Sequence, residues 1–141
     1  MKHAILAMAA AAILTGGASA ATTQAQVNDA LRGTPEIYNG LFTAALIKQI
    51  TDVCPAIRPP GRMARASYFL SLYKRARGMG YSRAQIEAFV EDKAEQDRMR
   101  ALVETHLRND GVNPHDEGEV CAYARTQIAE RSALGRQLSE R

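Results

Sequence analysis

The feature that most constrains the fold is a long apolar segment with a proline at each end. Thr34, Pro35 and Glu36 together indicate a helix start, since they suit the cap, the first turn and the positive end of the helix dipole. Pro55 directly follows Cys54 and ends the segment. The apolar side chains between them recur at helical spacing: Ile37, Leu41, Phe42, Ala45, Leu46, Ile50 and Val53. The pattern predicts a central helix that other elements surround.

Four further helices, one of them short, are predicted from the same spacing and from their end signals. Ser82 and Gln85 form a capping box before one of them, and Gly80 and Gly111 are glycines at which a helix commonly stops. The expected spans are 27–32, 62–79, 83–109 and 117–132.

The distribution of apolar and polar residues also predicts which parts of these segments are buried and which are exposed. The helix over 62–79 is expected to bury one side, made of Ala66, Phe69, Leu70, Tyr73 and Ala76. Residues 91–100 are almost wholly polar and are expected to face water. Residues 133–141 are expected to be a polar tail, with Leu134 and Leu138 as its apolar members.

The first 20 residues have the organisation of a secretory signal peptide. A basic start, Met1-Lys2-His3, precedes an unbroken run of 11 apolar residues, and Ala18-Ser19-Ala20 provides the small residues of a cleavage site. Eleven helical residues span roughly 17 Å, well short of the ~30 Å core of a bilayer, which disfavours a membrane anchor. We expect cleavage after Ala20 and a periplasmic or secreted mature chain with no transmembrane segment.

Cys54 and Cys121 are the only two cysteines. In an oxidising compartment two lone cysteines commonly pair, and these two lie in no C-x-x-C motif and have no histidine within four residues. A structural disulfide is therefore predicted, with a redox-active or metal-binding pair as the alternative. The bridge would close a loop of 67 residue steps, for which the chain-entropy relation gives about 4 kcal/mol of stabilisation.

No segment shows the alternating pattern of a β-strand, and no Asn-Gly hairpin turn is present. The predicted fold class is all-α: a small disulfide-linked helical bundle of three longer helices plus one or two short ones. We expect one helical domain over 21–141, with the tail 133–141 at its end.

Charge is distributed unevenly, although the net charge of the chain is only +3. Residues 53–86 contain no acid and seven basic residues, which form a candidate interaction surface: Arg58, Arg62, Arg65, Lys74, Arg75, Arg77 and Arg83. Residues 87–119 contain ten acids and four basic residues. Two interpretations stay open: neighbouring helices whose charges offset each other, or a docking surface that orients a protein partner. Nucleic acid is a poor partner outside the cytoplasm, and an anionic membrane surface is a further alternative for peripheral contact.

Nothing in the sequence indicates catalysis. The serines lack a G-x-S-x-G setting, and phosphate-binding loops are absent. Acidic and histidine residues cluster at two places where helix caps and solvated faces explain them: Glu91, Asp92, Glu95, His106, His115, Asp116, Glu117 and Glu119. We therefore expect no enzyme, no catalytic residue, no metal site and no cofactor.

Three stretches carry a resemblance to a known family. They are Pro35-Glu36-Ile37 with Val53-Cys54; Gly80-Tyr81-Ser82 with Ile86, Phe89 and Glu91-Asp92-Lys93-Ala94-Glu95; and Gly111-Val112-x-Pro114 with Cys121, Ile128-Ala129 and Gly135. Together they resemble a family of small secreted bacterial proteins of unknown function with two cysteines. Two features depart from it: the stiff turn Pro59-Pro60-Gly61 and a tail more polar than the usual apolar ending.

The resemblance implies no catalytic residues, and it implies genes located near those of the respiratory NADH:quinone oxidoreductase. The resulting expectation is a non-catalytic protein that acts by protein–protein interaction, as an accessory subunit on the periplasmic face of that membrane complex. The alternatives are a free-standing periplasmic stress chaperone and a small-molecule carrier with a cavity between its helices.

Overall fold

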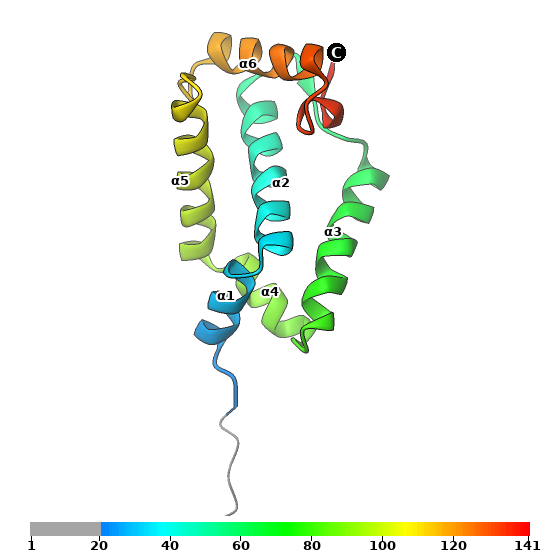
Figure 1. Ribbon diagram of the computed structural model, residues 1–141, viewed down its shortest axis with the longest axis vertical. Helices are drawn as coiled ribbons and strands as arrows, with labels where there is room; N and C mark the ends of the chain where they lie inside the picture. Colours follow the sequence, from blue (N-terminus) through cyan, green and yellow to red (C-terminus); the bar gives the residue numbers. More distant parts are fainter. Residues whose placement is uncertain (1–20) are drawn as a thin grey trace, which may run out of the picture.

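The computed structural model describes residues 21–141, so the predicted signal peptide, 1–20, lies outside the described residues. The described chain is all-α apart from one pair of two-residue strands, which confirms the predicted fold class (Figure 1). Its elements are α1 (Gln24–Arg32), α2 (Pro35–Val53), β1 (Ile57–Arg58), α3 (Arg62–Gly78), α4 (Arg83–Glu91), α5 (Lys93–Asn109), α6 (Glu117–Glu130), the 3-10 helix η1 (Gly135–Gln137) and β2 (Ser139–Glu140). No helix within residues 21–141 is sufficiently long and apolar to span a bilayer.

α2 lies in the middle of the molecule, with α5 along one side and α3 along the other, while α6 crosses one end (Figure 1). The half of α2 nearest α6 is the most deeply buried. Ile50 packs there with Leu107 of α5 and Val120 of α6, all three with no exposed surface. This end of the molecule contains the larger of two apolar clusters.

The other half of α2 belongs to a second, smaller cluster. Ile37 packs there with Leu31 of α1 and Phe89 of α4. α1 begins at Gln24, three residues before the expected start, because Thr23 and Gln26 form a capping box that fixes the first turn.

The predicted disulfide joins the two ends that close the larger cluster. Cys54 caps α2 and Cys121 lies in α6, and their Cα atoms are 5.4 Å apart. Both cysteines are buried. Disulfides persist in oxidising compartments, so this bond is compatible with a periplasmic or extracellular protein.

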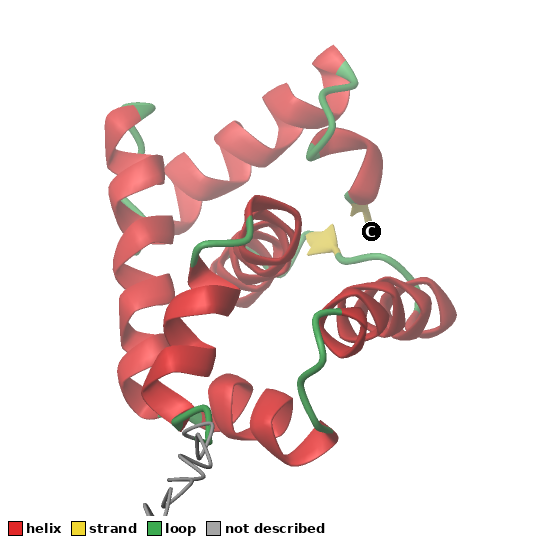
Figure 2. Cartoon of the chain, turned by 60° about the horizontal axis from the view of Figure 1, so that its bottom comes forward, coloured by secondary structure: helices red, strands yellow, loops and turns green. Residues whose placement is uncertain are grey.

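The helix predicted over 83–109 is two helices. The chain turns at Asp92, whose backbone is extended and whose side chain accepts a hydrogen bond from the Glu95 amide at 3.0 Å. Asp92 thus caps α5 from a position where no glycine or proline marks a break. The turn lets α4 cross beneath α2 while α5 runs beside it (Figure 2).

The C-terminal segment is docked on the fold, which corrects the expectation of a polar tail. β2 pairs antiparallel with β1, Ile57 opposite Glu140, and Leu138 is buried. Gly135 approaches α6 so closely that a Cβ atom there would lie 1.8 Å from the carbonyl oxygen of Gln127. The sequence signal for this docking is only one leucine and one glycine, too little to distinguish it from an exposed tail.

Candidate binding cleft

α3 is the least covered long helix among the described residues. Only Leu72 and Ala76 of its 17 residues are buried. Leu72 rests on Gly40 of α2, where an added Cβ would lie 2.7 Å from its Cδ2 atom. The Tyr68 hydroxyl donates a hydrogen bond to the Gly40 carbonyl oxygen at 2.8 Å. α3 therefore meets α2 closely around one glycine, because only a residue without a side chain allows that approach.

The predicted buried side of α3 is largely wrong. Phe69 and Leu70 are 47% and 50% exposed, and Met63 is 83% exposed. Apolar residues occur around most of this helix, so their spacing cannot identify the covered face. The first half of α3 is exposed apart from Tyr68, and its apolar residues stay in contact with water.

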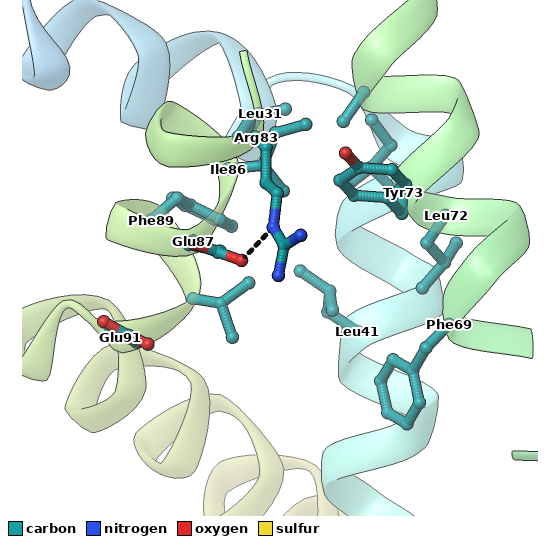
Figure 3. A pocket seen from close by; sticks show the side chains of 13 residues that line it. Leu31, Leu41, Phe69, Leu72, Tyr73, Arg83, Ile86, Glu87, Phe89 and Glu91 are labelled. Carbon is teal, nitrogen blue, oxygen red and sulfur yellow. Dashed lines mark hydrogen bonds and ion pairs between the residues drawn. The ribbon is translucent and has the colours of Figure 1, made fainter. Parts of the chain in front are cut away.

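A smaller hollow of about 480 Å³ lies where α3 faces α4 and the start of α2. Its walls are apolar, with Leu41, Leu72 and Phe89 among them (Figure 3). Arg83 extends into the space between the helices, and its Nε atom lies 2.6 Å from Oε1 of Glu87 (Figure 3). This hollow combines apolar walls with one charged pair.

A larger groove of about 1380 Å³ runs between α3 and α5, with α2 between them. α2 contributes Ala44 and Ala45, α5 contributes Met99 and Val103, and α3 contributes Tyr68. Four further residues line both the groove and the smaller hollow: Leu41, Phe69, Phe89 and Val90. The two hollows are therefore adjacent along the inner face of α3, and we call them together the α3 cleft.

One end of the groove contains a buried, incompletely paired carboxylate. The Glu95 side chain is 9% exposed and forms ion pairs with two arginines: its Oε1 lies 3.2 Å from Nε of Arg32, and its Oε2 lies 3.8 Å from Nε of Arg98. Arg32 Nε makes no hydrogen bond among the described residues. Glu95 Oε2 and the Tyr38 hydroxyl have no hydrogen-bond partner among residues 21–141, and both residues line the groove. Burial, and then the charge of Glu95, raise the pKa of Tyr38. The expectation that Glu95 faces water is thus wrong, because the turn at Asp92 directs it inward.

The opposite end of the groove is positively charged. Arg65 of α3 and Arg136 of η1 line it, and neither forms an ion pair within residues 21–141. The other charged groups along this part of the groove are paired: Lys48 with Asp52 at 2.6 Å, and Arg100 with Asp97 at 3.0 Å. The two arginines therefore leave an uncompensated positive charge.

The seven predicted basic residues are all exposed but have different neighbours. Arg65 lines the groove and Arg83 lines the smaller hollow. Arg75 pairs with Glu36 of α2 at 2.9 Å. Arg58 and Arg77 donate to backbone oxygens of Glu140 and Tyr81, and Arg62 and Lys74 are exposed.

Within residues 21–141, the basic and acidic stretches are joined by one ion pair, Arg83 with Glu87 at the start of α4. No ion pair within the described residues joins α3 to α5. The acids of α5 pair with basic residues of the same helix, as Asp97 does with Lys93 at 2.8 Å, and outside it with Arg32 or His115. The basic residues of α3 are therefore not paired with α5, and a docking role for them stays a prediction.

The histidines occupy ordinary structural positions. His106 makes an edge contact with Phe42, their ring centroids being 5.3 Å apart, and His115 lies 3.3 Å from Glu104. Within residues 21–141, no three His, Cys, Asp or Glu side chains gather in a way that could hold a metal ion. The cleft has apolar walls, with Glu95 and its two arginine partners at one end and Arg65 and Arg136, unpaired within the described residues, at the other.

One known protein family matches most of this chain. The model of a family of unknown function, DUF5333, matches residues 29–139. The chain belongs to the DUF5333 family. The match runs from α1 to β2, so both cysteines and the α3 cleft lie within the DUF5333 region. No curated protein and no solved structure matches the chain.

Proposed function

We propose that this protein is a non-catalytic binding protein that receives a segment of another protein in the α3 cleft. The observation that carries the proposal is the unpartnered apolar face of α3, with Phe69 half exposed opposite Leu41 and Ala45 of α2. A helix that is apolar on most sides is normally covered all round, and α2 lacks that cover on its groove side. Exposed apolar patches bordered by charge are typical of protein interaction sites.

The size of the groove favours a protein segment over a small molecule. Small-molecule sites typically enclose about 300–1,000 Å³. The groove alone is about 1380 Å³, and it opens along the length of α3. A small ligand would leave much of that apolar surface in water.

The partner suggested by the family resemblance is the respiratory NADH:quinone oxidoreductase, with this chain as an accessory subunit on its periplasmic face. Export through residues 1–20 would place the mature chain on that side of the membrane, where the Cys54–Cys121 bond is stable. The protein would then contact the membrane complex peripherally.

A capture experiment with matched variants tests this function. Oxidised protein is used to retrieve partners from detergent-solubilised membranes, and Phe69→Asp is compared with Leu70→Asp. The two side chains are equally exposed on the same helix, but Phe69 lines the cleft and Leu70 does not. We expect Phe69→Asp to lose the partner and Leu70→Asp to keep it, with unchanged circular dichroism in both. Equal retrieval by both variants would contradict the proposal.

A second candidate function is supported by the smaller hollow, whose volume of about 480 Å³ lies in the small-molecule range. Its walls are apolar apart from the Arg83–Glu87 pair and Glu91, which suits a small, mainly apolar ligand. Native mass spectrometry of the exported protein would detect such a ligand as a bound mass. Val90→Trp, which places a large side chain in this hollow, should abolish it.

A further inference from the structure

The side of α3 that faces away from the cleft carries a row of exposed residues, which we call the outer stripe: Met63, Ala66, Leu70, Lys74 and Arg77. They follow one another at spacings of three and four residues, so they lie on one side of the helix. None of them lines either hollow of the cleft. We infer that the outer stripe rests on the surface of an anionic lipid bilayer, an attachment that goes beyond the partner proposed for the cleft.

The outer stripe has the geometry of a ridge. A helix turns by about 100° per residue, so Leu70 points about 160° away from both Tyr68 and Leu72. Those two residues hold α3 against Gly40 of α2. α3 forms one edge of the molecule (Figure 1), and the stripe extends about 21 Å along it. The outer stripe therefore offers a convex ridge, which suits a flat surface better than it suits a peptide.

The part of the outer stripe nearest the start of α3 is apolar. Met63 is 83% exposed and Leu70 is 50% exposed, with Ala66 between them. When a helix lies in a membrane interface, apolar side chains on one side of it enter the boundary between headgroups and acyl chains. Their transfer from water is favourable in proportion to the apolar area removed. Because the area here is small, it gives weak and reversible binding unless charge adds to it.

The charge of this surface is positive throughout. Lys74 and Arg77 continue the outer stripe, Arg62 lies beside Met63 at its start, and residues 53–86 contain no acid. None of these three basic residues has an ion pair within residues 21–141. Each lysine or arginine near an anionic leaflet strengthens binding about fivefold. Their long stems also let the charged groups reach lipid phosphates while Met63 and Leu70 stay in the interface.

The same charge disfavours a second copy of the chain as the occupant of this surface. Two α3 helices that met through their outer stripes would bring Lys74 and Arg77 of each copy against a helix that contains no acid. Like charges brought together at an interface oppose association. An anionic bilayer instead supplies many phosphate groups, and it requires none of the shape complementarity that a protein partner needs.

Attachment through the outer stripe leaves the cleft accessible. Phe69 and Tyr68 line the cleft on the other side of α3. The protein could therefore lie on the membrane through one side of this helix while the other side binds a partner. The two interactions use separate residues, so each can be removed without the other.

Flotation with lipid vesicles tests the attachment. The exported, oxidised protein is mixed with vesicles of phosphatidylcholine alone or of an equal mixture of phosphatidylcholine and phosphatidylglycerol. We expect binding to the anionic vesicles only, and a loss of this binding as salt is added, because salt screens the attraction. Equal binding to both kinds of vesicle would overturn the inference. Binding to neither would also overturn it and would leave the outer stripe to an acidic protein.

Matched variants on the two sides of α3 locate the contact. Leu70→Asp and Lys74→Glu change the outer stripe, and Phe69→Asp and Arg65→Glu make equivalent changes on the cleft side. All four residues are exposed, so circular dichroism should be unchanged. We expect the outer-stripe variants to bind anionic vesicles at least about fivefold more weakly. The cleft-side variants should lose less than about twofold, because the helix is about 10–12 Å wide and the Debye length is about 8 Å at physiological salt.

Equal losses from the two sides would indicate a general attraction of the whole chain and would overturn the assignment to the outer stripe. The capture experiment on detergent-solubilised membranes has the opposite expectation, since Phe69→Asp should lose the partner there and Leu70→Asp should keep it. The failure of the vesicle experiment and the failure of the proposed function are therefore distinguishable.

Tryptophan fluorescence shows which side of the protein touches lipid. The chain contains no tryptophan, so Leu70→Trp places a single reporter on the outer stripe and Met99→Trp places one in the cleft. We expect anionic vesicles with brominated acyl chains to quench the emission of Leu70→Trp and to leave that of Met99→Trp unchanged. Quenching of Met99→Trp alone would place lipid in the cleft and would overturn the inference.

Discussion

The end of the molecule closed by the disulfide and the side formed by α3 are built in contrasting ways from the same central helix. At the disulfide end, Ile50 of α2 is enclosed by α5, α6 and the C-terminal segment, and none of its surface is exposed. On the α3 side, α2 presents Leu41 and Ala45 to an open groove, and α3 touches it mainly through Leu72. The first region behaves as a fixed framework, and the second has apolar surface that folding leaves uncovered.

This difference indicates where stability and binding are located. Burial of apolar surface is the main favourable term in folding, so mutations at the disulfide end should reduce the free energy of unfolding most. The exposed residues of the α3 cleft, such as Phe69, contribute less to that free energy and are free to contribute to binding. Five changes, taken from the largest expected effect to the smallest, test this separation.

The largest effect is expected from the double change Cys54→Ala and Cys121→Ala. Losing the cross-link over 67 residue steps should lower the free energy of unfolding by about 4 kcal/mol, measured by urea titration. Reduction of the wild-type protein should give a similar loss. Thiol titration of the denatured, unreduced protein should find no reactive thiol, and two reactive thiols would contradict the bond.

Gly135→Ala should be next. The new Cβ would meet the backbone of Gln127, which cannot rotate away, so the C-terminal segment must shift on α6. We expect a loss of about 2–3 kcal/mol in the urea titration. Gly78→Ala is the matched control, because nothing lies within 4 Å of a Cβ there, and it should be neutral or stabilising by up to about 1 kcal/mol. Equal effects of the two changes would refute the close packing of the tail.

Leu72→Ala removes the main apolar contact of α3 with α2. Because Leu72 is buried, we expect a loss of about 2 kcal/mol in the free energy of unfolding, and faster hydrogen exchange in α3 than in α5. Leu70→Ala on the exposed face should change stability by less than about 0.5 kcal/mol. A uniform increase of exchange over all helices would contradict the idea that α3 is a separate, weakly held element.

Reversal of three α3 charges together, Arg65→Glu, Arg75→Glu and Arg77→Glu, should affect binding much more than folding. Arg75 has an exposed ion pair with Glu36, and such pairs contribute about 0–1 kcal/mol. Circular dichroism should remain unchanged while partner capture is lost. A folded triple variant that retains every wild-type partner would exclude a docking role for these residues.

The smallest effect is expected on stability at alkaline pH, and it comes from Tyr123, which packs against the larger cluster at the disulfide end. Burial, and then the charge of Asp110, raise the pKa of Tyr123 to about 12. Folding thus favours the protonated phenol, so its contribution is fully present below the pKa of an unfolded tyrosine, about 10, and is lost as pH rises from 10 to 12. Tyr123→Phe should flatten the decline in stability over that interval, and an unchanged pH profile would contradict the assignment.

The sequence predicts the framework well because its signals are local. Thr34-Pro35 and Pro55 bound α2, Ser82 with Gln85 starts α4, and Asp116 caps α6 as its side chain accepts from the Glu119 amide at 2.8 Å. The disulfide follows from the cysteine count. In each case a few neighbouring residues determine the structure.

The cleft depends on distant residues and could not be predicted in the same way. Phe69 and Leu72 are both apolar and lie on the same helix, and only the glycine at position 40 of α2 determines which of them is buried. Glu95 lies in a polar stretch, and its burial results from the turn at Asp92. The one available signal was that α2 is apolar on more faces than its predicted neighbours could cover.

The antiparallel pairing of β1 with β2 gives α3 an unusual place in the chain. The framework is fastened just before α3, where Ile57 pairs with Glu140, and again just after it, where Ser82 caps α4. α3 thus connects two fixed points of the framework, through Pro59-Pro60-Gly61 on one side and Gly80-Tyr81 on the other. Such a segment can change at its exposed positions while the framework folds as before, provided that Leu72 and Ala76 keep their buried contacts. Exchanging α3 between members of the family should therefore transfer binding preference without redesign of the core.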